Sequence, residues 1–487
     1  MKRGLSLLAL VALLASPLLA QDPAAKTARR PNVLFIAIDD LKPLLGCYGD
    51  EVVQTPNLDR LAERGVVFEN TYCQQAVCGP SRASLLTGLR PDTTKVYDFH
   101  TKMRQVLPDV ITLPQHFKEN GYVALAFGKI FDGRCSDGWH TQDRRSWDAR
   151  ADWGGGALYA REESYSPRGP ARGVSTEAAD VVDEVYKDGA IAHVANTAMR
   201  KLADGDQPFF LAVGFTKPHL PFAAPQRYWD LYERADFDLA AFQQQAPGSP
   251  DFAYHNFGEL RNGYTDIPKE GPLSEEKQLE LIHGYHAAVS FVDAQVGKVL
   301  QTLDELGLRD DTIIVVWGDH GFHLGDHGLW CKHSNFEQAA RVPMLFAAPG
   351  GTLAGYRAQG MTEFVDIFPT LCDLAGLPQP EGLEGISLTP LLRGEKAAWP
   401  KRYAVSQYRR EDDTLMGHSF RTPRYRYTVW RKWDKGAAEP FGEVVATELY
   451  DYQRDPLETR SLSEDPAYAD VVREMQAIVA DFDARSR

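Results

Sequence analysis

Cysteine is scarce in this sequence, and its spacing excludes one common kind of site. The 487 residues include six cysteines, and no two of them form a Cys-x-x-Cys pair. No zinc-site spacing is therefore present. If one cysteine is committed to chemistry, five remain, and an odd number cannot all pair within the chain. The sequence thus assigns no disulfide among Cys47, Cys73, Cys78, Cys135, Cys331 and Cys372.

Positive charge is also in short supply. The 53 Lys and Arg residues are outnumbered by 67 Asp and Glu residues, which gives a net charge of -14. This balance argues against nucleic acid or an anionic membrane as a partner, so an anionic substrate would need a locally positive pocket. Internal repeats and low-complexity tracts are absent. The remaining composition, 44% hydrophobic and 25% charged, is that of an ordinary globular protein with a large core.

The N-terminus has the pattern of a secretory signal. An apolar run from Leu5 to Ala20 follows Met1-Lys2-Arg3 and is short for a membrane span. We therefore predict a signal peptide over residues 1–20 and a solvated linker over residues 21–30. The protein is then exported, periplasmic or secreted, with no membrane contact after cleavage. An uncleaved N-terminal anchor helix remains the alternative.

Four apolar runs of β-type residues each end in polar side chains. Such runs predict strands buried on both faces of a mainly parallel sheet. Helical patterns over residues 188–202 and 283–306 lie between them and predict an α/β sandwich. Ligand sites in such sheets form beyond the carboxyl ends of the strands, where distant residues can meet. The runs are Asn32–Ile38 before Asp39-Asp40, Tyr122–Phe127 before Gly128-Lys129, Phe209–Phe215 before Lys217-Pro218-His219, and Thr312–Trp317 before Gly318-Asp319-His320.

The pattern changes after about residue 396, where short strand-like segments precede a helical pattern over residues 466–485. We predict a catalytic domain over residues 31–395 and a C-terminal subdomain over residues 396–487. The subdomain is expected to be a small antiparallel sheet with one helix. Two long polar regions, 132–180 and 238–277, are expected to form walls of a substrate cleft, with plain surface insertions as the alternative.

The segment Cys78-Gly79-Pro80-Ser81-Arg82 opens an apolar, helix-forming run. Pro80 suits the first helical turn, where its missing N–H costs nothing. Cys78 would then lie at a helix N-terminus, where backbone N–H groups and the dipole favour anions. Arg82 adds a planar fork that matches sulfate or phosphate oxygens. The alternative is a buried cysteine beside a helix cap.

Asp39, Asp40 and Asp319 bring three carboxylates to two predicted strand ends. Unpaired, they would repel one another, and a divalent cation removes that cost. Oxygen ligands favour Ca²⁺, with Mg²⁺ possible, and His320 is the least typical of the four ligands. A helix cap after the first strand is the alternative for Asp39-Asp40.

Other polar residues near these strand ends are candidates for contact with substrate. Lys129, His219 and Lys332 supply positive charge or protons, whereas Lys217 is expected to point elsewhere. Loop packing is the alternative for the candidates that we expect to recognise substrate, which are Asp98, His100, Phe322, His323 and His333.

The Cys78–Arg82 segment resembles the signature of type I sulfatases, in which this cysteine is oxidised to formylglycine. The resemblance covers nearly the whole mature chain and is nearest to the iduronate-2-sulfatase group. It implies an alkaline-phosphatase-like fold and hydrolysis of a carbohydrate sulfate ester, here a 2-O-sulfated uronate in a sulfated glycan. Further matching segments are Gln74–Cys78, Arg90–Thr94, Phe117–Tyr122, Lys217–His219, Asp319–Gly321, Lys332–Phe336, Arg424–Trp430 and a Leu-Tyr-Asp…Asp-Pro-x-Glu stretch.

The resemblance also implies roles for single residues. A formylglycine-generating or equivalent maturation enzyme would modify Cys78. Arg82 and Lys129 would stabilise the formylglycine and the sulfate, and His219 and Lys332 would bind sulfate and serve the leaving group. The implied calcium ligands are Asp39, Asp40, the modified Cys78, Asp319 and His320.

One position departs from the family pattern. Asp132, which we also expect to contact substrate, stands where sulfatases have a histidine that takes the proton for collapse of the sulfated intermediate. A carboxylate is a weaker base than imidazole near neutral pH, and His140 is an alternative base. Two other functions stay open: a phosphodiesterase or phosphonate hydrolase of the same superfamily, and a non-catalytic binder of sulfated glycan.

Overall fold

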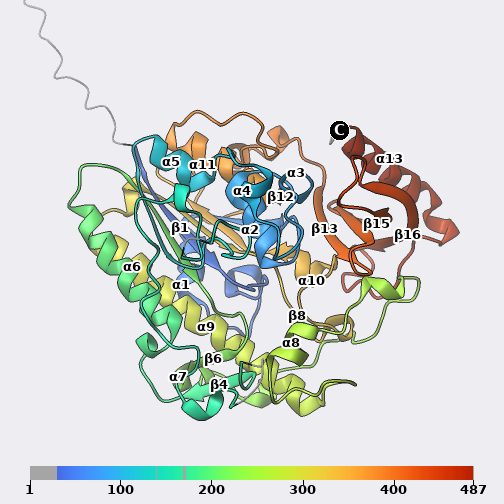
Figure 1. Cartoon of the computed structure of the whole chain (residues 1–487), viewed down its shortest axis with the longest axis horizontal. Helices are drawn as coiled ribbons and strands as arrows, with labels where there is room; N and C mark the ends of the chain where they lie inside the picture. Colours follow the sequence, from blue (N-terminus) through green and yellow to red (C-terminus); the bar gives the residue numbers. More distant parts are fainter. Residues whose placement is uncertain (1–29, 139, 168–171, 486–487) are drawn as a thin grey trace, which may run out of the picture.

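The computed structural model describes residues 30–138, 140–167 and 172–485 (Figure 1). The predicted signal peptide and nearly all of the predicted linker lie outside these residues. Within the described ranges, no helix combines the length and the apolar character needed to cross a membrane. All six cysteines are unpaired.

Four parallel strands form the centre of the main sheet. Strand β1 (Asn32–Ile38) lies between β5 (Phe209–Phe215) and β7 (Thr312–Gly318), and β3 (Val123–Gly128) pairs with β5. Every residue of β1, β5 and β7 is buried, as the continuous apolar runs predict. Because the strands are parallel and in register, their carboxyl ends lie along one edge of the sheet.

The sheet continues beyond β7 with antiparallel pairs. Its full order is β10-β2-β11-β7-β1-β5-β3, and β12 (Tyr356–Glu363) pairs in parallel with β2. The other strands are β2 (Val66–Tyr72), β10 (Arg341–Val342) and β11 (Met344–Ala347).

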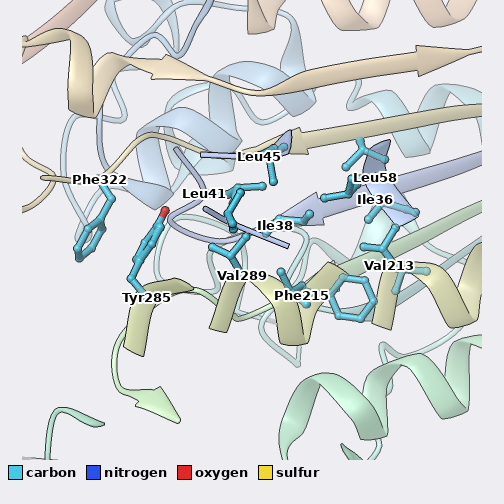
Figure 2. Close-up of a cluster of buried hydrophobic side chains, with 14 of the residues drawn as sticks. Ile36, Ile38, Leu41, Leu45, Leu58, Val213, Phe215, Tyr285, Val289 and Phe322 are labelled. Atoms are coloured by element: carbon cyan, nitrogen blue, oxygen red, sulfur yellow. The ribbon is translucent and has the colours of Figure 1, made fainter. Parts of the chain in front are cut away.

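Helices cover both faces of this sheet. Because successive side chains of a strand point to opposite faces, β1 contributes to both of the resulting cores. Leu34, Ile36 and Ile38 pack with α1 (Pro56–Arg64), α6 (Lys187–Ala203) and α9 (Glu275–Glu305). Figure 2 shows part of this core around Ile36, Ile38 and Val289. Val33, Phe35 and Ala37 face the opposite core, which contains α2 (Cys78–Thr87), α5 (Leu113–Glu119) and α11 (Ile367–Ala375).

A separate four-stranded antiparallel sheet lies at the C-terminal end of the chain, to the right in Figure 1. Its strands are β13 (Ala404–Arg410), β14 (Leu415–Arg421), β15 (Tyr425–Trp433) and β16 (Phe441–Asp451). Helix α13 (Ala469–Arg485) packs on it through Met475 and Val479. The predicted α/β sandwich with a mainly parallel sheet and a small antiparallel sheet plus helix is confirmed.

The two sheets meet at the segment that flanks α2. Gln75 forms a β-bridge with Gln407 of β13. The ring of Tyr97 packs edge-on against Trp433 at 4.9 Å between centroids. The C-terminal sheet therefore supports the chain just before and just after α2.

Candidate active site

The predicted polar residues converge at the carboxyl edge of the parallel strands. Asp39 follows β1, Lys129 follows β3, and Asp319 follows β7. Helix α2 begins at Cys78 above this edge, so that its N-terminus faces the carboxylates. Segments far apart in the sequence thus form one polar cluster, as parallel pairing of the strands predicts.

Cys78 lies at the first position of a helix that is completely buried. All ten residues of α2 are buried, and Cys78 is 1% exposed. Its Sγ lies 3.4 Å from Asp39 Oδ1 and 3.3 Å from His320 Nε2. Burial, together with the charge on Asp39, raises the pKa of the thiol well above its usual range. Among these protein groups, the unmodified thiol is therefore not a thiolate.

Arg82 ties the helix to both acidic strand ends. Its Nε donates to Asp319 Oδ2 at 2.8 Å, and its Nη2 donates to Asp39 Oδ1 at 3.1 Å. Its Nη1 donates to the carbonyl oxygens of Lys129 and Ile130 at 2.6 and 3.0 Å. Burial opposes the charge, but the two carboxylates raise the pKa of Arg82 further. Four of its five N–H donors are thus used inside the cluster, so Arg82 orients the carboxylates.

The buried carboxylates differ in how far their charge is compensated: burial would raise the pKa of Asp39, but Lys129 and Arg82 lower it well below its usual range. Burial and the charge on Asp39 raise the pKa of Asp319. Asp40 has a left-handed backbone, with φ of 62°, a conformation that is uncommon outside glycine and is often found at functional sites. Asp319 Oδ1 accepts a bond from the Asp40 backbone N–H at 2.9 Å.

This group has the composition of a metal site. Asp39, Cys78, Asp319 and His320 each place one ligand atom within 4.8 Å of the others. Asp40 Oδ1 lies 3.3 Å from His320 Nε2. Buried, mutually repelling carboxylate oxygens fit a hard divalent cation. All the predicted metal ligands are therefore brought together, although their role in binding stays a prediction.

Lys129 and Lys332 each contact one of the two adjacent carboxylates that follow β1. Lys129 Nζ lies 2.6 Å from Asp39 Oδ2, and Lys332 Nζ lies 2.9 Å from Asp40 Oδ2. Lys332 follows a small hairpin of β8 (His323–Leu324) and β9 (Trp330–Cys331). Burial opposes both charges, but the neighbouring carboxylates raise the pKa of each lysine. Both are therefore ammonium ions that can neutralise a bound anion.

Glu259, which no sequence motif indicates, contacts two of these predicted residues. Its Oε1 lies 2.9 Å from Lys332 Nζ and 3.1 Å from His219 Nε2. It lies in the first turn of α8 (Gly258–Gly263), within the polar region 238–277. Burial would raise its pKa, but the charges of Lys332 and His219 lower it well below its usual range. The Glu259 carboxylate is therefore an internal anion. It already occupies the donor groups of Lys332 and His219 that are predicted to bind sulfate.

We expect Glu259→Gln to strengthen the binding of inorganic sulfate, because a neutral amide competes less well for Lys332 and His219. The inhibition constant of sulfate should fall about fivefold, which corresponds to about 1 kcal/mol. Competitive inhibition of sulfate ester hydrolysis measures it. Glu280→Gln is the matched control, since Glu280 pairs with Lys277 and has similar exposure. An unchanged or higher inhibition constant in Glu259→Gln would contradict this prediction.

Lys217 points away from the acidic cluster. Its Nζ donates to the carbonyl oxygens of His219 and Pro221 at 2.9 and 2.5 Å. Burial lowers its pKa to about 8. Through these two hydrogen bonds, its ammonium group stabilises the loop that carries His219.

Asp132 is close to the cluster but is already paired. Its two carboxylate oxygens accept bonds from Arg134 Nε and Nη2 at 2.9 and 2.7 Å. Burial would raise its pKa, but the bonds from Arg134 lower it. A carboxylate that is held in its ionised form is a weaker proton acceptor. His140, the alternative base, is exposed in the polar loop that follows.

Two of the predicted substrate-binding residues are buried in the structure. The Phe322 side chain is 1% exposed, and its ring stacks on Tyr285 with 5.4 Å between centroids. Figure 2 shows both rings. His323 is 0% exposed, and its Nε2 lies 2.8 Å from Ser334 Oγ. Both side chains therefore pack inside the protein, as the loop-packing alternative expects.

The three other candidates differ in exposure. Asp98 is 4% exposed, and its Oδ1 accepts bonds from the backbone N–H groups of His100 and Thr101. His100 is exposed beside it. His333 is partly exposed, with Nε2 at 3.8 Å from Glu259 Oε2. Of these three residues, His333 is the one whose side chain approaches Glu259, the internal anion.

Two protein-family models together match the chain from residue 31 to residue 485. The sulfatase family model matches residues 31–377, and a model described as the C-terminal part of N-sulphoglucosamine sulphohydrolase matches residues 325–485. The human iduronate 2-sulfatase is 34% identical, with 93% of this chain and 94% of the relative covered. A delta 4,5-hexuronate-2-O-sulfatase of Bacteroides thetaiotaomicron is 29% identical, with 95% and 91% covered.

A solved structure shows the same architecture. The phosphonate monoester hydrolase of Agrobacterium radiobacter superposes with a TM-score of 0.76 at 25% identity, over 94% of this chain and 96% of the other. The alkaline-phosphatase-like fold that the resemblance implies is therefore confirmed. With the family model over most of the chain and a relative above 30% identity, the protein belongs to the sulfatase family and is a sulfuric ester hydrolase.

Proposed function

We propose that the protein removes a 2-O-sulfate from a uronic acid at the non-reducing end of a sulfated glycan. The observation that supports this chemistry is the position of Cys78 at the N-terminus of α2, in contact with Asp39 and His320. Arg82 binds Asp39 in the same cluster. The names of the human and Bacteroides relatives support a 2-sulfated uronate as substrate.

Formylglycine, formed from Cys78 by a formylglycine-generating or equivalent maturation enzyme, is the proposed nucleophile. Its hydrate would offer a hydroxyl oxygen to the sulfur atom. The chain holds this position at a helix N-terminus, where free N–H groups stabilise negative charge. The bonds from Arg82 to Asp39 and Asp319 keep the acidic edge of the sheet in place beneath it.

Calcium is the proposed cation, with magnesium as the alternative. Asp39, Asp40, Asp319 and His320 would hold it together with the modified Cys78. When bound, the cation supplies positive charge that neutralises the carboxylates and polarises a sulfate oxygen.

The remaining cations neutralise the sulfate as its bond to the sugar oxygen breaks. Lys129 and Lys332 are held in their charged forms by Asp39 and Asp40. His219 Nδ1 lies 2.6 Å from the carbonyl oxygen of Leu220, which can only accept, so Nδ1 carries a proton. Nε2 faces the site, 3.1 Å from Glu259 Oε1. Lys332, or His219 when Nε2 is also protonated, would protonate the leaving alcohol.

We expect a clear preference for uronate 2-sulfate over 6-sulfated amino sugar in otherwise matched oligosaccharides. A carboxylate beside the sulfate adds a second charged contact, which is worth about tenfold or more in kcat/KM. Sulfate release by the correctly modified protein measures the preference. Preference for the amino sugar would overturn the substrate proposal and leave the sulfatase assignment intact.

Assays on aryl sulfate and aryl phosphate diesters test the phosphodiesterase or phosphonate hydrolase alternative. Tight glycan binding without sulfate release would identify a non-catalytic binder instead. We also propose export, which rests on the basic and apolar pattern of residues 1–20. N-terminal sequencing of the mature protein checks this step.

A further inference from the structure

A guanidinium group without a role in the proposed chemistry lies close to the nucleophile. Arg134 Cζ is 3.4 Å from the centre of the Phe99 ring. Phe99 lies against the first turn of α2, since a Cβ on Gly79 would be 3.3 Å from Phe99 Cδ1. Arg134 is therefore separated from the turn that carries Cys78 by one aromatic side chain.

The guanidinium of Arg134 is held on one edge and open on another. Its Nε and Nη2 donate to the carboxylate of Asp132, which also accepts from the Arg134 backbone N–H at 3.0 Å. No described residue accepts a hydrogen bond from Nη1. The Arg134 side chain is 55% exposed, whereas that of Asp132 is 4% exposed. The open Nη1 edge can donate to a second carboxylate while Asp132 keeps the first.

This arrangement is ready for an anion before substrate arrives. The ion pair with Asp132 and the stacking on Phe99 restrict the long arginine side chain, so less conformational entropy is lost on binding. Asp132 has no other described side-chain partner, which fits a role in holding Arg134.

The other cations near the site are engaged more fully. Lys129 is bound to Asp39, and Lys332 is bound to both Asp40 and Glu259. Burial lowers the pKa of His333 well below its usual range, so it is a poor cation at neutral pH. Lys435 is half-exposed but reaches towards Asp98 at 3.2 Å. Among these described cations, Arg134 is the one that combines exposure, a fixed position and an open edge.

We propose that Arg134 binds the carboxylate of the uronic acid through the Nη1 edge of its guanidinium and so determines specificity for uronates. Asp132 and Phe99 are the residues that position it. This inference rests on the proposed uronate 2-sulfatase activity.

The test compares two substrates that differ only in the carboxylate, a uronate 2-sulfate and the corresponding neutral hexose 2-sulfate. We expect Arg134→Gln to lower the ratio of their kcat/KM values about tenfold to hundredfold, mainly through KM of the uronate. Arg134→Lys keeps the charge without the fork and should lose less of the preference. Because Arg134→Gln leaves Asp132 without its partner, melting temperatures are measured, and Arg134→Lys decides the result if the first variant does not fold.

Arg145→Gln is the matched control, since its side chain is 54% exposed and pairs weakly with exposed Asp109 at 3.8 Å. It should keep the wild-type ratio. A wild-type enzyme without preference for the uronate would overturn both this inference and the proposed substrate. A wild-type preference that persists in folded Arg134 variants would overturn this inference alone. Equal losses on both substrates would assign Arg134 to the sulfate and likewise refute a carboxylate role.

Discussion

Replacement of Cys78 by alanine is expected to abolish sulfate release, with a loss of at least about 10⁴-fold in kcat. Alanine cannot be converted to formylglycine, so no nucleophile remains at the N-terminus of α2. The fold should persist, because alanine is smaller than cysteine and truncation of one buried atom costs about 1 kcal/mol. Sulfate release and the melting temperature, measured on the same preparation, check both parts.

Cys73→Ala is a close control for this variant. Cys73 is also buried, five residues before the helix, and its Sγ has only a weak contact with the carbonyl oxygen of Ala339 at 3.9 Å. It should retain activity. Peptide mass spectrometry of protein from its native host should find formylglycine at position 78. Active protein that carries only unmodified cysteine at position 78 would refute the proposed mechanism.

Removal of divalent cations is expected to abolish activity and to lower the melting temperature. Without a cation, Asp39, Asp40 and Asp319 are buried like charges close together. An ion present at about a thousand times its dissociation constant stabilises the fold by about 4 kcal/mol, and chelation removes this contribution.

Thermal unfolding and sulfate release are measured before and after dialysis against a chelator, with calcium and magnesium added back separately. The control is the same chelator already saturated with calcium, which should have no effect. Full activity in exhaustively demetallated protein would disprove a metal requirement. Recovery with magnesium but not calcium would change the identity of the ion.

The central part of the site could be predicted because it follows from strand geometry. Continuous apolar runs identified β1, β5 and β7, and parallel strands bring the residues after them to one edge. Asp39, Lys129 and Asp319 therefore meet as expected. The helix after Cys78 was predictable from Pro80 and the apolar residues that follow it.

Residues in the long polar regions could not be placed in the same way. Glu259 and Arg134 belong to segments without hydrophobic periodicity, so nothing local indicates which way they face. The expectation that these regions line a cleft was the available signal, but it named neither residue. Phe322 and His323 directly follow a predicted metal ligand, yet their side chains are buried in the structure. Adjacency in sequence does not determine side-chain direction in a loop.

The acidic cluster is assembled from segments that are distant along the chain, and this has a consequence for folding. Asp40 and Asp319 are 279 residues apart, and Asp40 and Lys332 are 292 residues apart. Contacts of such long range form late, because chain entropy must be lost before they stabilise anything. A refolding chain can recover its helices early and still lack every acidic contact that spans the sheet. Regained activity therefore reports that the central sheet is complete. Regained helicity reports only that the helices have formed locally.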